Sequence, residues 1–217
     1  MCQPASFIVT NYQVFWSKLN ESHESIIEEN KLDDTKKQPD FIRVEIIPEN
    51  QNYLLTLSQW QYRLDQDIAP AWYAAKEVEK RARAELPAWF TFHVKTSGHH
   101  VITKGWVFLH DSSSAELHGS SSAVLHGSSS ARLYDSSSAR LCGSSSAVLC
   151  GSSSAVLCGS SSAVLYGSSS AVLYDSSSAV LCGSSSAVLY RCNKITVFDQ
   201  GAVIDRRHGT PTLIVRQ

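Results

Sequence analysis

The sequence lacks any long hydrophobic run and any strong excess of charge. None of its 217 residues lies in a stretch of 18 or more apolar residues, which a transmembrane helix requires. The net charge of -1 at pH 7 argues against a general nucleic-acid or membrane-surface binder. The first residues, MCQPASFIVTNYQVFW, lack a basic start followed by a long apolar run, so we expect no secretory signal. The expected location is therefore the cytoplasm, where thiols stay reduced.

Motifs of metal centres and hydrolases are also missing. No C-x-x-C pair occurs, and Cys142, Cys150, Cys158 and Cys182 share one position of a repeat, which indicates repetition rather than a disulfide framework. No G-x-S-x-G motif occurs, and a nucleophilic serine needs a base and an orienting acid around one particular residue. We therefore expect no catalytic, cofactor-binding or metal-binding residues and no enzymatic activity.

The region before the repeats has ordinary mixed composition and predicts a small α+β unit. The runs FIRVEII (41–47) and YLLTL (53–57), joined by a polar turn, are typical of a β-hairpin. A helix with a charged face is predicted over 69–86, and Pro87 is expected to end or kink it. The segment 12–29 is expected to contain a further helix.

From Asp111 to Tyr190 the sequence consists of ten uninterrupted octads. They read DSSSAELH, GSSSAVLH, GSSSARLY, DSSSARLC, GSSSAVLC, GSSSAVLC, GSSSAVLY, GSSSAVLY, DSSSAVLC and GSSSAVLY. A helix would rotate each octad by an offset of about 80°, so the leucines would form no stripe. A disordered serine-rich linker is the alternative. However, a solvated linker has no reason to keep a leucine at fixed spacing.

One short strand in each octad fits the pattern, because eight is even and every octad then presents the same residues to the same face. Charges occur at position 6, as Glu116, Arg132 and Arg140, so this position faces solvent. Ser at position 3, Ala at position 5 and Leu at position 7 then face inward, and the inward serine is expected to satisfy backbone groups of the turn. Gly or Asp at position 1 supplies a corner, since Gly reaches positive φ freely and Asp bonds its own backbone.

The predicted fold class is therefore mainly β, a parallel β-solenoid of octapeptide repeats. The inward side chains are too small to fill a wide triangular interior, so we favour flattened, two-sided 16-residue coils, and ten octads then form five coils. Triangular 24-residue coils are the alternative. A 16-residue coil places Cys142 over Cys158, whereas a 24-residue coil stacks Cys158 with Cys182.

Less regular repeats extend the pattern on both sides. Apolar residues at matching positions are Val101, Val107, Leu109, Ile195, Val197 and Val203. We therefore expect a small N-terminal α+β unit over 1–94 and a solenoid over 95–217, with clean octads in 111–190 and degenerate repeats and a C-terminal cap in 191–217. The N-terminal unit is expected to cap the other end, because an open end of a solenoid is an unpaired strand edge.

Histidines gather at the start of the solenoid, where a 16-residue coil brings His110 and His126 into one column. They stand near enough to share a metal ion. Otherwise they are half-exposed neighbours, like the tyrosines at the same position, and this is the interpretation that we favour.

The C-terminal half of the repeats carries apolar columns on its predicted outer surface. These are Val148, Val156, Val164, Val172, Val180 and Val188 at position 6, with Tyr166, Tyr174 and Tyr190 at position 8. A contiguous apolar strip indicates a contact surface and predicts self-association, although valine is also a common outward residue of strands. The sequence does not identify another protein partner.

The octads GSSSAVLY and DSSSA, preceded by LDQDIAPAWY (64–73) and GHHVITKGWVFLHDSSSAEL (98–117), resemble uncharacterised octapeptide-repeat β-solenoid proteins of gut bacteria and their phages. The resemblance is specific in the repeats and less so upstream. It implies a bacterial or phage origin and a β-solenoid, with association with a virion as an alternative location. It implies no activity and no catalytic residues.

The leading hypothesis is a non-enzymatic structural or interaction protein, a rigid rod that presents ordered rows of Ser, Val and Tyr to a partner or to itself. The alternative is a phage- or bacterium-encoded binding module, in which the N-terminal unit recognises the target and the solenoid is a spacer. Neither hypothesis involves nucleic acid or a membrane.

Overall fold

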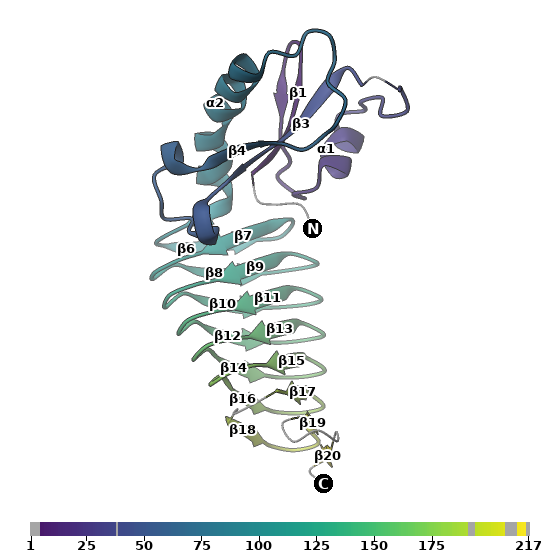
Figure 1. The fold of residues 1–217 in the computed structure, drawn as a ribbon. Helices are drawn as coiled ribbons and strands as arrows, with labels where there is room; N and C mark the ends of the chain where they lie inside the picture. The colour runs from purple at the N-terminus through teal and green to yellow at the C-terminus, as the bar shows by residue number, and fades with distance from the viewer. Residues whose placement is uncertain (1–4, 38, 191–193, 207–211, 216–217) are drawn as a thin grey trace. The chain divides into compact units, whose positions relative to one another are not determined.

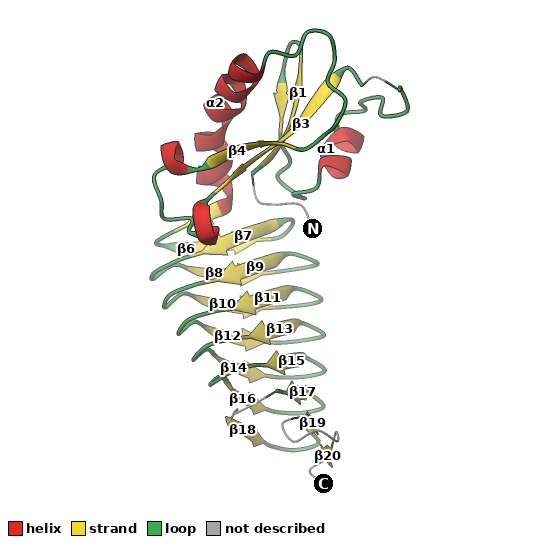
Figure 2. Cartoon of the chain, viewed as in Figure 1, coloured by secondary structure: helices red, strands yellow, loops and turns green. Residues whose placement is uncertain are grey.

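A computed structural model describes residues 5–37, 39–190, 194–206 and 212–215 (Figure 1). The chain divides into two compact units, residues 1–93 and 94–217. The first unit combines helices and strands, whereas the second consists of strands joined by short turns (Figure 2). In the described ranges, no helix has both the length and the apolar character needed to cross a membrane.

The first unit is built on a four-stranded antiparallel sheet in the order β2-β1-β3-β4. Its strands are β1 (Ser6–Thr10), β2 (Val14–Phe15), β3 (Phe41–Ile47) and β4 (Gln61–Leu64). Helix α1 (His23–Glu29) packs Ile26 and Ile27 against Ile8 and Phe41 on one face of the sheet. Helix α2 (Ala75–His93) lies on the opposite side (Figure 2).

The predicted strand over 53–57 is wrong, and β3 pairs with β4 instead. Two short 3-10 helices, η1 (Glu49–Gln51) and η2 (Leu57–Gln59), enclose this run. Thr56 and Gln59 form a capping box at the start of η2, with Thr56 Oγ1 2.6 Å from Gln59 Oε1. Because the cap fixes a helical turn there, the chain cannot stay extended through the run.

Both predicted helices exist, but their ends differ from the prediction. Helix α1 begins at His23 because the Ser22 side chain accepts a hydrogen bond from the N–H of Ser25, and β2 occupies part of the residues before it. Helix α2 continues through Pro87. Its buried stripe includes Trp89 beyond the proline, so burial of this ring offsets the backbone hydrogen bond that Pro87 cannot donate.

The second unit is a β-solenoid made of two parallel sheets. Successive octads alternate between a seven-stranded sheet, β18-β16-β14-β12-β10-β8-β6, and a nine-stranded sheet, β20-β19-β17-β15-β13-β11-β9-β7-β5. Ala131 lies opposite Ala147, so paired strands are two octads apart. This register confirms the two-sided coil and excludes the triangular one. The clean octads form five coils, and the flanking strands extend the stack to seven turns.

Each clean octad contributes one strand over its positions 4 to 7. These are β8 (Ser114–Leu117), β9 (Ser122–Leu125), β10 (Ser130–Leu133), β11 (Ser138–Leu141), β12 (Ser146–Leu149), β13 (Ser154–Leu157), β14 (Ser162–Leu165), β15 (Ser170–Leu173), β16 (Ser178–Leu181) and β17 (Ser186–Leu189). The flanking strands are β5 (Val94–Lys95), β6 (His99–Ile102), β7 (Trp106–Leu109), β18 (Lys194–Val197), β19 (Ala202–Asp205) and β20 (Thr212–Val215). Among the described strands of this unit only β20 is antiparallel, and it pairs with β19 as the last strand of its sheet.

The interior confirms the predicted parity. Every leucine at position 7 is fully buried, and the alanines at position 5 and serines at position 3 are buried as well. Side chains at position 6 are half-buried or exposed. In the C-terminal flank, Ile195, Val197 and Val203 contribute to the same core, as predicted.

Val101 is an exception to the predicted parity, because its side chain is 59% exposed. It lies opposite Glu116, whereas its neighbour Ile102 lies opposite Leu117 and packs against the core. Paired residues of the clean octads are two octads apart, whereas Val101 and Glu116 are one residue closer in the sequence. The chain from β6 to β8 is therefore one residue shorter than a regular coil, and this reverses which side chains of β6 face inward.

The corners explain why position 1 is restricted to Gly or Asp. Gly159 has φ of 67° and Asp135 has φ of 57°, and the other described corners of the clean octads share this left-handed backbone. A Cβ added to Gly159 would lie 3.1 Å from the carbonyl oxygen of Gly143 in the preceding coil. The prediction that aspartate at this position bonds its own backbone is wrong for Asp135. Its carboxylate accepts from the N–H of Gly119, one coil earlier, at 2.9 Å.

The inward serines fall into two groups. Ser145 Oγ donates to the carbonyl of Cys142 at 2.9 Å, which is the predicted role. The same bond is made by Ser113, Ser121, Ser129, Ser137, Ser161 and Ser177. Ser153 Oγ is equally buried, yet in the described structure it has no hydrogen-bond partner, and Ser169 and Ser185 share this state.

The two groups of serines therefore predict different outcomes for the same Ser→Ala substitution. Ser145→Ala removes a buried hydrogen bond and should lower the free energy of unfolding by about 1 kcal/mol. Ser153→Ala removes a buried hydroxyl that has no partner, so stability should stay the same or rise. Chemical denaturation followed by circular dichroism measures both. Equal losses in the two variants would contradict the assigned hydrogen bonds.

Candidate functional site

The outward positions of the octads form straight columns along both sheets, because each strand pairs in register with its neighbours. The valines predicted to form an apolar surface are divided between two sheets. The seven-stranded sheet carries Val148, Val164 and Val180, and the nine-stranded sheet carries Val156, Val172 and Val188. The apolar surface therefore consists of two separate valine rows on different sheets.

A shallow groove of about 630 Å³ follows the outer face of the seven-stranded sheet. Its walls are the serines at position 4 and the side chains at position 6, with the alanines of position 5 between them. Glu116 and Arg132 lie towards one end of the groove, and Lys194 lies at the other. The groove therefore combines an apolar, hydroxyl-lined centre with charged ends.

Side chains at position 8 form two further columns beside the sheets. The column that follows the nine-stranded sheet, here the His–Cys–Tyr column, contains His110, His126, Cys142, Cys158, Tyr174 and Tyr190. Like residues are neighbours in it. The rings of Tyr174 and Tyr190 stack with centroids 5.0 Å apart and planes 7° apart. The column that follows the seven-stranded sheet contains His118, Tyr134, Cys150, Tyr166 and Cys182.

His110 and His126 are brought together as predicted, but as a stacked pair. Their ring centroids are 5.1 Å apart and their planes differ by 8°. The nitrogen lone pairs lie in the ring planes, so in parallel stacked rings they do not converge on one point. Burial, and next to it the charge of His126, lower the pKa of His110 to about 4, and burial also lowers the pKa of His126. The pair is therefore uncharged at neutral pH.

Cys142 and Cys158 are free thiols that follow the paired strands β11 and β13. Burial, and next to it the thiol of Cys142, raise the pKa of Cys158. The thiol of Cys158 is therefore protonated at neutral pH, and its reactivity is low. Cys150 and Cys182 follow the other sheet and are separated by Tyr166 in their column.

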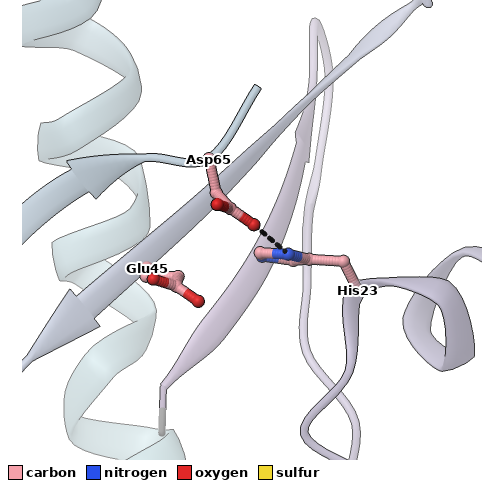
Figure 3. A group of neighbouring side chains, drawn as sticks. All are labelled: His23, Glu45 and Asp65. Carbon is pink, nitrogen blue, oxygen red and sulfur yellow. Dashed lines mark ion pairs between the residues drawn. The ribbon is translucent and has the colours of Figure 1, made fainter. Parts of the chain in front are cut away.

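A third group of chemically capable side chains lies in the first unit, and the sequence analysis missed it. His23 at the start of α1, Glu45 on β3 and Asp65 directly after β4 place one ligand atom each within 4.8 Å of one another (Figure 3). His23 Nδ1 is 3.1 Å from Asp65 Oδ2. The three residues lie far apart in the sequence. The one signal was Glu45, a carboxylate between the apolar residues Val44 and Ile46 of the strand.

The surroundings of this group are partly closed. His23 and Glu45 are almost fully buried, whereas the side chain of Asp65 is 36% exposed. His23 Nε2 lies 3.1 Å from the carbonyl oxygen of Val44. The guanidinium of Arg63 reaches the outer side of Glu45, with Nη1 3.9 Å from Oε2. The group can therefore hold a proton or a cation between one imidazole and two carboxylates.

Comparisons of the chain with protein-family models, curated proteins and solved structures found no match.

The register of the coil predicts which cysteines an oxidant joins. Cys142 and Cys158 follow strands one coil apart, at a spacing of about 4.8 Å, which lies within the Cα separation that a disulfide spans. Oxidised glutathione at alkaline pH, where the raised pKa of Cys158 is overcome, should give Cys142–Cys158 as the main intramolecular disulfide. Peptide mapping identifies the product. Recovery of Cys158–Cys182 as the main product would contradict the two-sided register.

The histidine pair predicts an acid-dependent loss of stability. The folded pKa of His110 is lowered to about 4, whereas an unfolded histidine takes up a proton below about pH 6.5. The unfolded chain therefore binds more protons between these values, and stability falls as pH falls through this window. Replacing both residues by tyrosine, which stacks in the same column, should reduce the fall in unfolding temperature between pH 7 and pH 4.5. The same pH dependence in both proteins would contradict this assignment.

Proposed function

We propose that this protein is a non-enzymatic structural or interaction protein, and that its solenoid is a rigid rod presenting ordered rows of side chains to a second copy of the chain. The observation that supports the proposal most directly is the in-register repetition of position 6 along each sheet. The last three clean coils repeat the same valine and serine side chains on the same face. Such a surface suits contact with another surface of the same period.

Rigidity of the rod follows from hydrogen bonds between consecutive coils. The N–H of Ser146 donates to the carbonyl of Ser129 at 3.0 Å, at the start of the strand. The N–H of Cys150 donates to the carbonyl of Leu133 at 2.8 Å, at its end. The corner itself is also tied, because the N–H of Ser144 donates to the carbonyl of Gly127 at 3.0 Å. The spacing of the outer rows is therefore fixed.

The charges along the seven-stranded sheet favour a second copy in antiparallel orientation. An arrangement with two-fold symmetry that places the β12 and β14 strands of the two copies against each other brings Glu116 of one copy near Lys194 of the other. Both pairs of opposite charges then form at once, because a two-fold interface is self-complementary. Val148 and Val164 lie at the centre of this surface. The seven-stranded face is therefore the proposed contact.

A second candidate function is a binding module in which the first unit recognises the target and the solenoid is a spacer. The observation in its favour is a pocket of about 250 Å³ in the first unit, lined in part by Tyr12, Trp72 and Arg81. Tyr12 is 88% exposed. Tyrosine, tryptophan and arginine are the residues most enriched at the energetic centres of protein interfaces.

Two matched substitutions test the proposed contact. Val164→Arg introduces a charge in the centre of the seven-stranded face, whereas Val172→Arg introduces the same charge on the nine-stranded face. Arg132 and Arg140 already occupy position 6, so the fold tolerates arginine there. Val164→Arg should weaken self-association at least about tenfold, because it places a charge against an apolar surface. Val172→Arg should leave it unchanged.

Sedimentation velocity over a range of concentrations measures self-association, and circular dichroism checks that the solenoid is retained. Equal effects of the two variants would contradict the choice of face. A wild-type protein that stays monomeric at all concentrations would contradict self-association and favour the second candidate function.

A further inference from the structure

We propose that His23, Glu45 and Asp65 form a binding site for one divalent transition-metal ion, for which Zn²⁺ is the appropriate probe. Two protein ligands of a zinc ion each lie about 2.0–2.2 Å from the metal, so they are about 3–3.6 Å from each other. His23 Nδ1 and Asp65 Oδ2 are already 3.1 Å apart. Glu45 places a carboxylate oxygen within 4.8 Å of one ligand atom of His23 and one of Asp65. Glu45 therefore supplies the third ligand of the set.

The orientation of the imidazole is the one that a metal ligand needs. His23 Nε2 lies 3.1 Å from the carbonyl oxygen of Val44, and a carbonyl oxygen only accepts hydrogen bonds. The Nε2 proton is therefore fixed on this side of the ring. Histidines that bind metals with one nitrogen commonly donate the other N–H to a backbone carbonyl in this way. Nδ1 faces Asp65, and the side chain of Glu45 belongs to the same group (Figure 3).

A divalent ion at this position lies next to two carboxylates, of which Glu45 is almost fully buried. Positive charge is favourable there because buried carboxylates need compensation.

Regular structure and local hydrogen bonds position all three ligands. Ser22 caps α1 directly before His23, and Glu45 lies in the middle of the sheet, opposite Ser6 and Arg63. The N–H of Asp65 donates to the carbonyl of Arg43 at 2.9 Å, which extends the pairing of β4 beyond its last residue. The site therefore requires little reorganisation to bind a metal ion.

The donor set identifies the class of metal. One imidazole nitrogen and two carboxylate oxygens suit zinc and its neighbours, and no thiol takes part in this group. The partial exposure of Asp65 provides a route for the ion and leaves room for water as a fourth ligand. The thiols of the His–Cys–Tyr column lie in the second unit and offer a different, sulfur-rich environment. The two kinds of site are therefore distinguishable by spectroscopy.

The test uses the full-length protein after treatment with a chelator. Titration with ZnCl₂ in a calorimeter should show one site, and Co²⁺ should give a visible spectrum without a thiolate charge-transfer band. Glu45→Gln and Asp65→Asn should each weaken Zn²⁺ binding by at least about 100-fold, because loss of a direct ligand exceeds the 10- to 100-fold typical of supporting residues. Glu24→Gln, an exposed position on the same helix, should bind as the wild type does.

Asp65→Asn keeps the test decisive, since Asp65 is partly exposed and its replacement should not disrupt folding, which circular dichroism verifies. Zn²⁺ should also raise the unfolding temperature of the wild type and of Glu24→Gln, but not of Asp65→Asn. The proposal is overturned by the absence of binding at millimolar Zn²⁺, by equal binding in wild type and Asp65→Asn, or by a Co²⁺ spectrum that reports thiolate ligands.

Discussion

The pairing of each strand with the strand two octads away is the interaction on which the solenoid depends. In this register every residue of the clean octads lies next to the residue at the same octad position in the neighbouring strand. Each position must therefore tolerate a column of identical or similar side chains. Leucine, alanine and serine do so easily, and aromatic rings do so by stacking. Like charges do not. Arg132 and Arg140 accordingly occupy different sheets, where Arg132 lies between Glu116 and Val148, and Arg140 lies between two valines.

The corner completes this arrangement in a way that links neighbouring coils. A left-handed backbone at position 1 favours glycine, and the close approach of the preceding coil leaves little room for a side chain. Aspartate is accepted at Asp135 and Asp175 because each carboxylate bonds the N–H of a glycine one coil earlier. The substitution of Gly by Asp therefore adds a contact between coils at a position where most other side chains would introduce strain.

The solenoid was largely predictable because its information is local and repeated. The parity of the octad, the small inward residues and the charges at position 6 determine the face, the coil size and the core. The other features of the fold and the candidate site depend on contacts between distant segments or on single residues. The pairing of β3 with β4, the passage of α2 through Pro87 and the outward turn of Val101 have no periodic signal. The His23–Glu45–Asp65 group is missed for the same reason, since pairing of β3 with β4 and packing of α1 bring it together.

Because one coil contains two octads, the loss or gain of an odd number of octads has a different effect on the solenoid from the loss or gain of an even number. The insertion or deletion of whole octads changes the length of the rod and keeps the phase of every remaining octad. A change of two octads alters the length of the rod by one coil and leaves every later residue on its own sheet. A change of one octad transfers everything beyond it to the opposite sheet, so that Lys194 would no longer share a face with Glu116. Length can therefore vary in evolution without loss of the surface pattern, provided that octads are gained and lost in pairs.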